Sequence, residues 1–341
     1  LEKNAVVFPT RDALWYNPRR VLGWGKRASQ GASYFVADNP AFGASIKYYL
    51  KDGFTDKKSE RVKREKAVTK AGKNYEFPGW AALEEERKEL APKVWMLIKD
   101  GNGDLVRYLP TSSKKGMHEV VWDLRYPGTS AMSKQGYGGG RGFLCEPGTY
   151  SAELVSRANG NLSVLSEPIS FNVVQINEGS LKGADIKEVA DFWRSIEDAN
   201  RHISASRMIM RDALARVNAM EKLLGQTPKA PSQLHKDWTD LRKELYNLDQ
   251  DLNGMKSKRE VGQNTNPTIS SRMGSVYSGV NSSTYGPTAM HREQFKIALA
   301  ELKTFESTLE VIVNEKLPSL EKAFKEAGSP YIEGMEYSPK D

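Results

Sequence analysis

Oxygen-bearing side chains alternate in one short segment of this chain, D-G-N-G-D at residues 100–104. Asp100, Asn102 and Asp104 are of the residue types that surround a calcium ion when they occupy alternate positions of a loop. No glutamate follows at the distance that an EF-hand requires, and Asp, Asn and Gly are also the common residues of hairpin turns. We interpret the segment as a turn between two strands and keep the three residues as a calcium-site hypothesis.

The other residues that could carry chemistry show no spacing typical of a catalytic site. The four histidines, His118, His202, His235 and His291, have no cysteine or second histidine at ligand spacing. Cys145 is the one cysteine, and its surroundings F-L-C-E-P-G-T-Y favour a small buried side chain over a nucleophile. The sequence has no G-x-S-x-G elbow, phosphate-binding loop or dinucleotide fingerprint. We therefore predict no catalytic residue and no cofactor.

Aromatic residues gather in two segments that are candidates for partner contact. Trp15, Tyr16 and Trp24 lie in an aperiodic N-terminal segment, and so many aromatic side chains are costly to leave in solvent. Tyr277 and Tyr285 lie in a segment rich in serine and glycine at residues 262–286, which we expect to be a loop. A connection of that length is often functional. We predict that these five aromatic residues contact a partner.

The composition narrows the class of protein. The chain has 341 residues, of which 39% are hydrophobic and 27% charged, and this length allows two or three domains. The net charge of +7 is spread along the chain. Its densest basic stretch, residues 57–70, is interrupted by Glu60 and Glu65 and resembles no nucleic-acid-binding motif, so we predict a solvated surface there and no nucleic-acid partner. No apolar run of about eighteen residues occurs, which predicts no transmembrane segment.

Short apolar runs that end at Gly, Asp, Asn or Pro predict strands between residues 40 and 176. The first run alternates, with Ala44, Ile46, Tyr48 and Leu50 on one side. Residues 94–109 predict a hairpin, residues 120–124, 149–155 and 169–174 predict further strands, and the glycine-rich residues 136–142 predict a flexible loop. Residues 53–91 form a charged insertion with one short helix. This pattern is typical of an antiparallel sandwich of the immunoglobulin or fibronectin kind.

From about residue 185 the apolar period changes from two to three and a half residues. One row with a spacing of seven consists of Val189, Ile196, Ile203, Met210, Val217 and Leu224. Similar rows at residues 234–255 and 295–312 predict two more helices, the last of which breaks or kinks at Pro318. We predict an antiparallel three-helix bundle at residues 185–328 and a tail at residues 329–341.

The order of several motifs resembles a family of large bacterial proteins. The motifs are N-P-A-F-G-A-S-I-K-Y-Y-L-K-D, F-P-G-W-A-A-L-E-E-E, I-K-D-G-N-G-D-L-V-R, G-M-H-E-V-V-W-D-L-R, P-G-T-Y-S-A-E-L and G-P-T-A-M-H-R-E-Q-F. They resemble the C-terminal part of sortilin-like, BNR-repeat β-propeller proteins, which are often labelled glycosyl hydrolases. The Asp-box turns of the propeller are absent here. The resemblance implies that residues 1–39 are the exit from a preceding propeller and that the protein is exported, in the periplasm, at the outer membrane or at the cell surface.

We expect a non-catalytic accessory region that supports its own propeller and binds a partner protein or a glycan. One alternative is a glycoside hydrolase whose catalytic site lies mainly on the propeller and which would need two facing carboxylates in this region. Another is a subunit of an outer-membrane assembly, marked by a broad exposed apolar patch.

Overall fold

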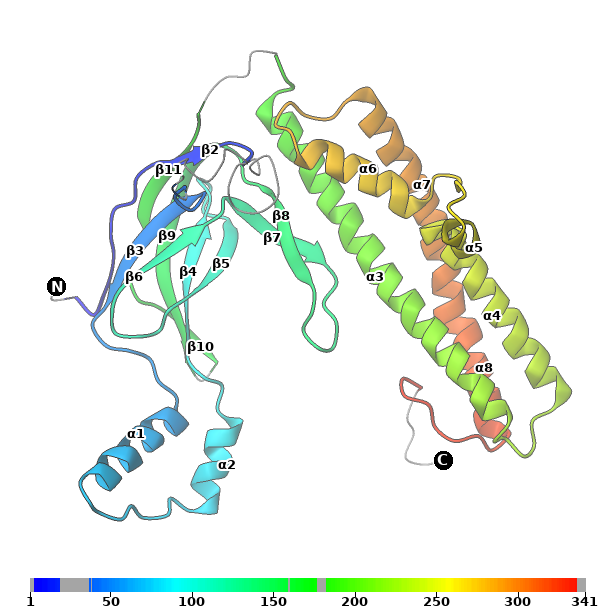
Figure 1. The fold of residues 1–341 in the computed structure, drawn as a ribbon, viewed down its shortest axis with the longest axis horizontal. Helices are drawn as coiled ribbons and strands as arrows, with labels where there is room; N and C mark the ends of the chain where they lie inside the picture. Colours follow the sequence, from blue (N-terminus) through cyan, green and yellow to red (C-terminus); the bar gives the residue numbers. More distant parts are fainter. Residues whose placement is uncertain (1–2, 19–36, 38, 159, 177–181, 336–341) are drawn as a thin grey trace, which may run out of the picture. The chain divides into compact units, whose positions relative to one another are not determined.

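The computed structural model describes residues 3–18, 37, 39–158, 160–176 and 182–335. The chain divides into two compact units. The first, which we call the sheet unit, comprises Leu1–Pro127 and Leu144–Ser180. The second, the helical unit, comprises Gly128–Phe143 and Leu181–Asp341. The protein is thus a mixed α and β chain whose strands precede most of its helices (Figure 1).

Two largely antiparallel sheets build the sheet unit. One has the order β1 (Ala5–Val7), β3 (Ala44–Leu50) and β6 (Gly116–Trp122). The other has the order β2 (Ala13–Trp15), β11 (Ile169–Gln175), β9 (Gly148–Ala158), β4 (Lys93–Lys99) and β5 (Leu105–Thr111), and β10 (Asn161–Val164) pairs with β9. Burial alternates along β3 as the sequence predicts, because successive side chains of a strand point to opposite faces.

Aromatic side chains from the two sheets meet in the core of the sheet unit. Trp122 of β6 is fully buried, and its ring centroid lies 5.1 Å from that of Tyr150 on β9 and 6.2 Å from that of Phe171 on β11. Tyr48 and Ile46 of β3 are also fully buried. Large aromatic rings at the centre of the contact supply much of the apolar area that stabilises such a unit.

The N-terminal segment belongs partly to these sheets, so the domain boundary that we expected at residue 40 does not hold. β1 pairs antiparallel with β3, and β2 pairs parallel with β11. The Trp15 side chain is 3% exposed, and its Nε1 donates to the carbonyl oxygen of Cys145 at 2.6 Å. Strands of three residues are too short to show an alternation of apolar and polar residues in the sequence. They form because strands distant in sequence pair with them.

The charged insertion between β3 and β4 folds as two helices, α1 (Lys57–Lys70) and α2 (Trp80–Lys88). The short helix that we predicted corresponds to α2. Asp56 caps α1, since its side chain accepts a hydrogen bond from the Ser59 backbone N–H. Neither helix contributes a buried side chain.

The helical unit contains three helices where the apolar rows predict them. These are α3 (Ile186–Leu224), α4 (Ser232–Asn253) and α7 (Ala289–Val311). The row with a spacing of seven in α3 is buried from Val189 to Val217. α7 continues through a π-helical turn, η1 (Ile312–Lys316), into α8 (Leu317–Glu326). The interruption that we predicted at Pro318 therefore takes the form of a π turn that precedes this proline.

The serine-rich segment that we expected to be a loop contains another helix, α6 (Ile269–Asn281), which follows the short α5 (Lys256–Glu260). Four apolar residues of α6 are buried at spacings of four and three, namely Ile269, Met273, Val276 and Val280. Thr268 forms a capping box with Ser271 at its start. Serine and glycine have low helix propensity, so the packing of this apolar stripe stabilises the helix.

Most of a hairpin from the strand-rich part of the sequence belongs to the helical unit. β7 (Arg125–Ser130) pairs with β8 (Gly139–Leu144), and residues Gly128–Phe143 group with the helices. A strand thus occupies much of the stretch 136–142 that we expected to be a flexible loop. The pairing depends on close backbone approach, since a Cβ at Gly128 would lie 2.1 Å from the Gly139 carbonyl oxygen.

Candidate binding pocket in the helical unit

The hairpin, α3 and α6 enclose a pocket of about 320 Å³. Every residue that lines it belongs to the helical unit. The lining residues that carry the argument are Arg141, Phe143, Glu197, Asn200, Arg207 and Tyr277. Cations, a carboxylate, an amide and a phenol therefore converge on one concave surface from three elements that are distant in sequence.

Two hydrogen bonds to α3 hold the hairpin that forms one wall of the pocket. The Thr129 Oγ1 donates to the backbone oxygen of Glu197 at 3.0 Å. The Ala131 backbone N–H donates to the Ser204 Oγ at 2.9 Å. Residues 197 and 204 are two helical turns apart, so β7 follows the axis of α3 along this stretch.

Glu197 is the buried acid of the pocket, with 7% of its surface exposed. Its Oε1 accepts a hydrogen bond from the Phe143 backbone N–H at 2.9 Å, and its other oxygen pairs with the Arg194 guanidinium. Burial raises the pKa of Glu197 above its ordinary range, while Arg194 and the Phe143 N–H act in the opposite direction. The carboxylate therefore links β8 to α3 from the interior.

An aromatic stack lies behind the pocket. The Phe143 ring is stacked on Trp193, with the centroids 5.4 Å apart and the planes 8° from parallel. The centroid of the Tyr277 ring lies 5.1 Å from that of Phe143, on the side toward the pocket. Phe143 is 1% exposed, whereas Tyr277 is half-buried. Tyr277 is thus the aromatic member of the group that a ligand can reach.

Two arginines give the rim of the pocket a positive character. Arg207 of α3 donates through Nη2 to the Ser270 Oγ on α6 at 2.8 Å, which holds its guanidinium beside the opening. Arg141 of β8 lines the same opening. The negative charge of Glu197 is paired with Arg194, and the Ser270 partner of Arg207 is a neutral hydroxyl, so Arg207 adds positive charge to the rim.

The structure places the predicted contact residues in different surroundings. Tyr277 lines the pocket, whereas Tyr285 lies after α6, and its carbonyl oxygen accepts from the Ala184 N–H at 2.9 Å. Trp15 is a core residue of the sheet unit and not a contact residue, because strand β2 turns its indole inward. Tyr16 is 42% exposed and makes an edge contact with Phe42 at 4.9 Å. Trp24 lies outside the described residues.

The calcium hypothesis has a simpler structural explanation. Residues 100–104 connect β4 to β5, and one oxygen of Asp100 accepts from the backbone N–H groups of Asn102 and Asp104, each at 2.9 Å. The Asp100 N–H also donates to the Asp104 carbonyl oxygen at 2.9 Å. Within the parts of the chain that the structure describes, no group of three His, Cys, Asp or Glu side chains could hold a metal ion. The Asp100 carboxylate therefore serves the turn.

A pair of facing carboxylates would support glycoside hydrolysis, and the two buried glutamates with a raised pKa, Glu197 and Glu321, can be compared on this point. Burial raises the pKa of Glu321 on α8, as it does that of Glu197, and Glu321 pairs with Arg216 of α3. Residues 197 and 216 are about 28 Å apart along α3, so the two carboxylates do not face each other across one site. Each is instead paired with an arginine of α3, Glu197 with Arg194 and Glu321 with Arg216, which is a structural arrangement.

Comparison with known proteins identifies no relative of this chain: no family model, curated protein or solved structure matches it. Among the described residues, no helix combines the length and apolar character needed to cross a bilayer.

Sequence reasoning named one member of the pocket, Tyr277, and missed Glu197, Asn200, Arg141 and Arg207. Glu197 directly follows the buried Ile196 in the helix segment D-F-W-R-S-I-E-D-A. A carboxylate next to the apolar row was the one available signal. The grouping itself depends on the docking of a hairpin that sequence spacing assigns to the strands.

Proposed function

We propose that this chain is a non-catalytic binding module, and that its helical unit recognises a glycan or a segment of a partner protein in the pocket between the hairpin, α3 and α6. The single observation that carries the proposal is the convergence of Tyr277, Asn200 and the arginine pair on one concave surface. Preformed pockets with a few convergent polar groups are the usual form of a binding site.

The chemistry of the pocket suits a hydroxyl-rich ligand with some negative charge. A half-buried tyrosine ring offers an apolar face, the Asn200 amide can both donate and accept, and the guanidinium of Arg207 donates in a fixed geometry. Sugars combine an apolar ring face with hydroxyl groups, and acidic sugars add a carboxylate. An anionic oligosaccharide therefore fits these groups better than an apolar molecule does.

The proposal extends to the whole chain through the family resemblance. On that basis the sheet unit is an immunoglobulin-like sandwich, the helical unit is an elaborated helical bundle, and both follow the propeller of an exported protein. The contact of Trp122 with Tyr150 and Phe171 from the other sheet supports the sandwich. The alternative of a glycoside hydrolase places its catalytic residues on the propeller and stays a prediction.

A glycan array probed with the purified chain tests the binding proposal. We expect binding to acidic oligosaccharides, and isothermal titration with the best probe should show a loss of about tenfold in affinity for Asn200→Ala and for Arg207→Gln, since each removes a hydrogen-bonding group from the pocket. Tyr277→Phe retains the contact with Phe143 and removes only the hydroxyl.

Tyr285→Phe is the matched control, because it makes the same change on the same segment outside the pocket. A deletion of residues 270–285 is unsuitable, since it would remove the buried stripe of α6. If Tyr285→Phe weakened binding as much as the pocket substitutions, or if no oligosaccharide or envelope protein bound the intact chain, the pocket would not be the recognition site.

A further inference from the structure

The two helices between β3 and β4 form a surface that the sheets do not bury. We call residues 56–90 the helical arm. Neither α1 nor α2 contributes a buried side chain, and the connection between them lies at the end of the arm away from the strands (Figure 1). The shape of the arm therefore depends on contacts within itself.

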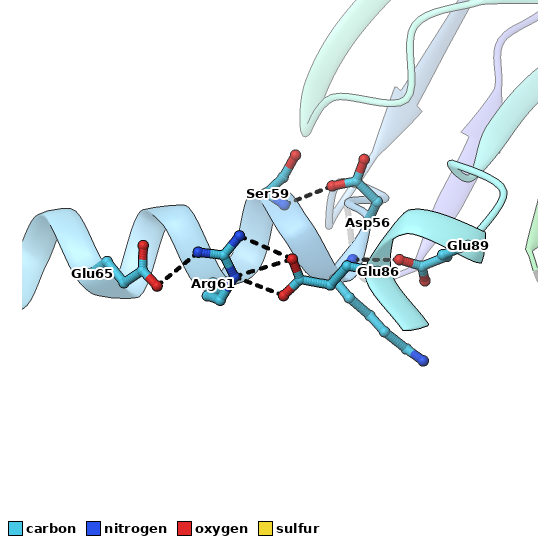
Figure 2. A network of polar contacts seen from close by, with 7 residues as sticks. Asp56, Ser59, Arg61, Glu65, Glu86 and Glu89 are labelled. Carbon is cyan, nitrogen blue, oxygen red and sulfur yellow. Dashed lines mark hydrogen bonds and ion pairs between the residues drawn. The ribbon is translucent and has the colours of Figure 1, made fainter. Parts of the chain in front are cut away.

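Arg61 holds the two helices of the arm together, as Figure 2 shows. Its Nε lies 2.7 Å and 3.0 Å from the two carboxylate oxygens of Glu86 on α2, and its Nη1 lies 2.7 Å from Glu65 on the next turn of α1. The side chains of Arg61 and Glu86 are only 17% and 9% exposed. The guanidinium lowers the pKa of Glu86, which keeps this carboxylate ionised. A bidentate pair of this kind fixes geometry as well as charge.

Four more carboxylates of the arm make contacts within it. The Asp56 side chain accepts from the Ser59 N–H at 2.7 Å, and Glu89 accepts from the Lys57 N–H at 2.7 Å (Figure 2). Two more pairs on α2 are Glu84 with Arg87 and Glu85 with Lys88. Glu65, Glu84, Glu85 and Glu86 are thus paired with cations of the arm.

The lysines on the opposite face of α1 take no part in these ion pairs. Lys63, Lys66 and Lys70 are spaced at three and four residues, so they lie on one face of the helix. All three are exposed, and among the described residues none forms an ion pair. Lys73 continues the basic row into the connection.

Aromatic side chains are exposed where this basic row ends. Tyr75 is 55% exposed, Phe77 is 58% exposed and Trp80 is 79% exposed. The rings of Phe77 and Trp80 contact each other at 4.9 Å, edge to face. Exposed apolar groups that cluster in this way mark an interaction surface more often than scattered ones do.

We propose that the helical arm docks on an anionic lipid bilayer, with the aromatic tip in the interfacial region and the lysine row against the headgroups. Tryptophan and tyrosine prefer the membrane interface, and lysines are attracted to anionic lipid surfaces. Lysine is depleted in protein–protein interfaces, which disfavours an acidic protein as the occupant. The proposal is independent of the binding function above, since the arm belongs to the sheet unit and shares no residue with the pocket.

Cosedimentation of the full chain with vesicles tests the proposal. We expect binding to vesicles of equal parts phosphatidylglycerol and phosphatidylcholine, and little binding to phosphatidylcholine alone. Neutralising Lys63, Lys66 and Lys70 together to glutamine should weaken partition by about one hundredfold, since each lysine near an anionic surface accounts for roughly fivefold. Substituting Phe77 and Trp80 by serine should weaken the part of the binding that persists at high salt.

The matched control removes the same charge from exposed lysines of the helical unit, with Lys236, Lys243 and Lys303 changed to glutamine. Equal losses in both triple variants would show that only net charge matters and would overturn the proposal. Binding to soluble polyglutamate with no binding to the anionic vesicles would assign the arm to an acidic protein instead. Circular dichroism before the assay ensures that each variant compared is folded.

Discussion

The substitution Phe143→Ala tests whether the β7–β8 hairpin is part of the helical unit. Phe143 is continuous in sequence with Cys145 and Tyr150 of the sheet unit, yet its ring is stacked on Trp193 of α3 and contacts Tyr277 of α6. Phe143 is only 1% exposed, so truncation to alanine removes a ring that is almost completely buried.

Truncation of a buried phenylalanine to alanine costs about 3–5 kcal/mol, through lost transfer free energy and the cavity that remains. For a unit of this length each kcal/mol lowers the Tm by about 2–4 °C. We therefore expect the helical unit to melt about 6–20 °C lower, and the hairpin and the N-terminal turns of α3 to lose protection from hydrogen exchange first. The strands of the sheet unit should keep theirs.

Hydrogen exchange measured by mass spectrometry reads the two units separately in one experiment. Phe171→Ala is the matched control, because Phe171 is 3% exposed and lies 6.2 Å from Trp122 in the core of the sheet unit. The two substitutions should produce opposite patterns. Faster exchange in β9 and β11 with unchanged α3 and α6 after Phe143→Ala would refute the assignment of the hairpin to the helices.

Four further predictions concern individual contacts. Glu197→Ala should destabilise the helical unit by about 1–3 kcal/mol in thermal unfolding at neutral pH, since the buried Phe143 N–H loses its acceptor. The pKa of Glu197 in the folded protein lies above its unfolded value of about 4.3. The free energy of unfolding should therefore fall as pH rises from the unfolded to the folded pKa, because the buried carboxyl ionises there. Glu197→Gln cannot ionise, so its stability measured against pH should not show this loss. Arg61 lowers the folded pKa of Glu86, so the pairing of α1 with α2 should persist above about pH 4.3 and disappear as pH falls through the lower folded pKa; an NMR titration of the Glu86 carboxyl that shows an ordinary pKa would contradict the pairing. Gly128→Ala should open the hairpin, because the added Cβ would lie 2.1 Å from the Gly139 carbonyl oxygen, and unchanged exchange of the β8 amides in this variant would contradict that close approach.

Sequence periodicity was sufficient where one element buries one continuous face. The rows of α3, α4 and α7 predicted three helices, and the alternation of β3 predicted its buried side, because the helical and strand periods differ clearly over seven or more residues. The same reasoning failed for α6, whose serines and glycines obscure a stripe of only four apolar residues.

Amino-acid sequence alone determined the mixture of strands followed by helices, the turn at Asp100 and the charged character of the arm. Only the tertiary structure decided that β1 and β2 pair with strands that come later in the sequence. It also decided that residues Gly128–Phe143 of the β7–β8 hairpin pack with the helices. The candidate pocket depends wholly on that second event, since Arg141, Glu197 and Tyr277 are separated by dozens of residues and no local period relates them. Local propensity determines which residues form helices and strands. Contacts such as that of Phe143 with Trp193 determine which of these elements pack together.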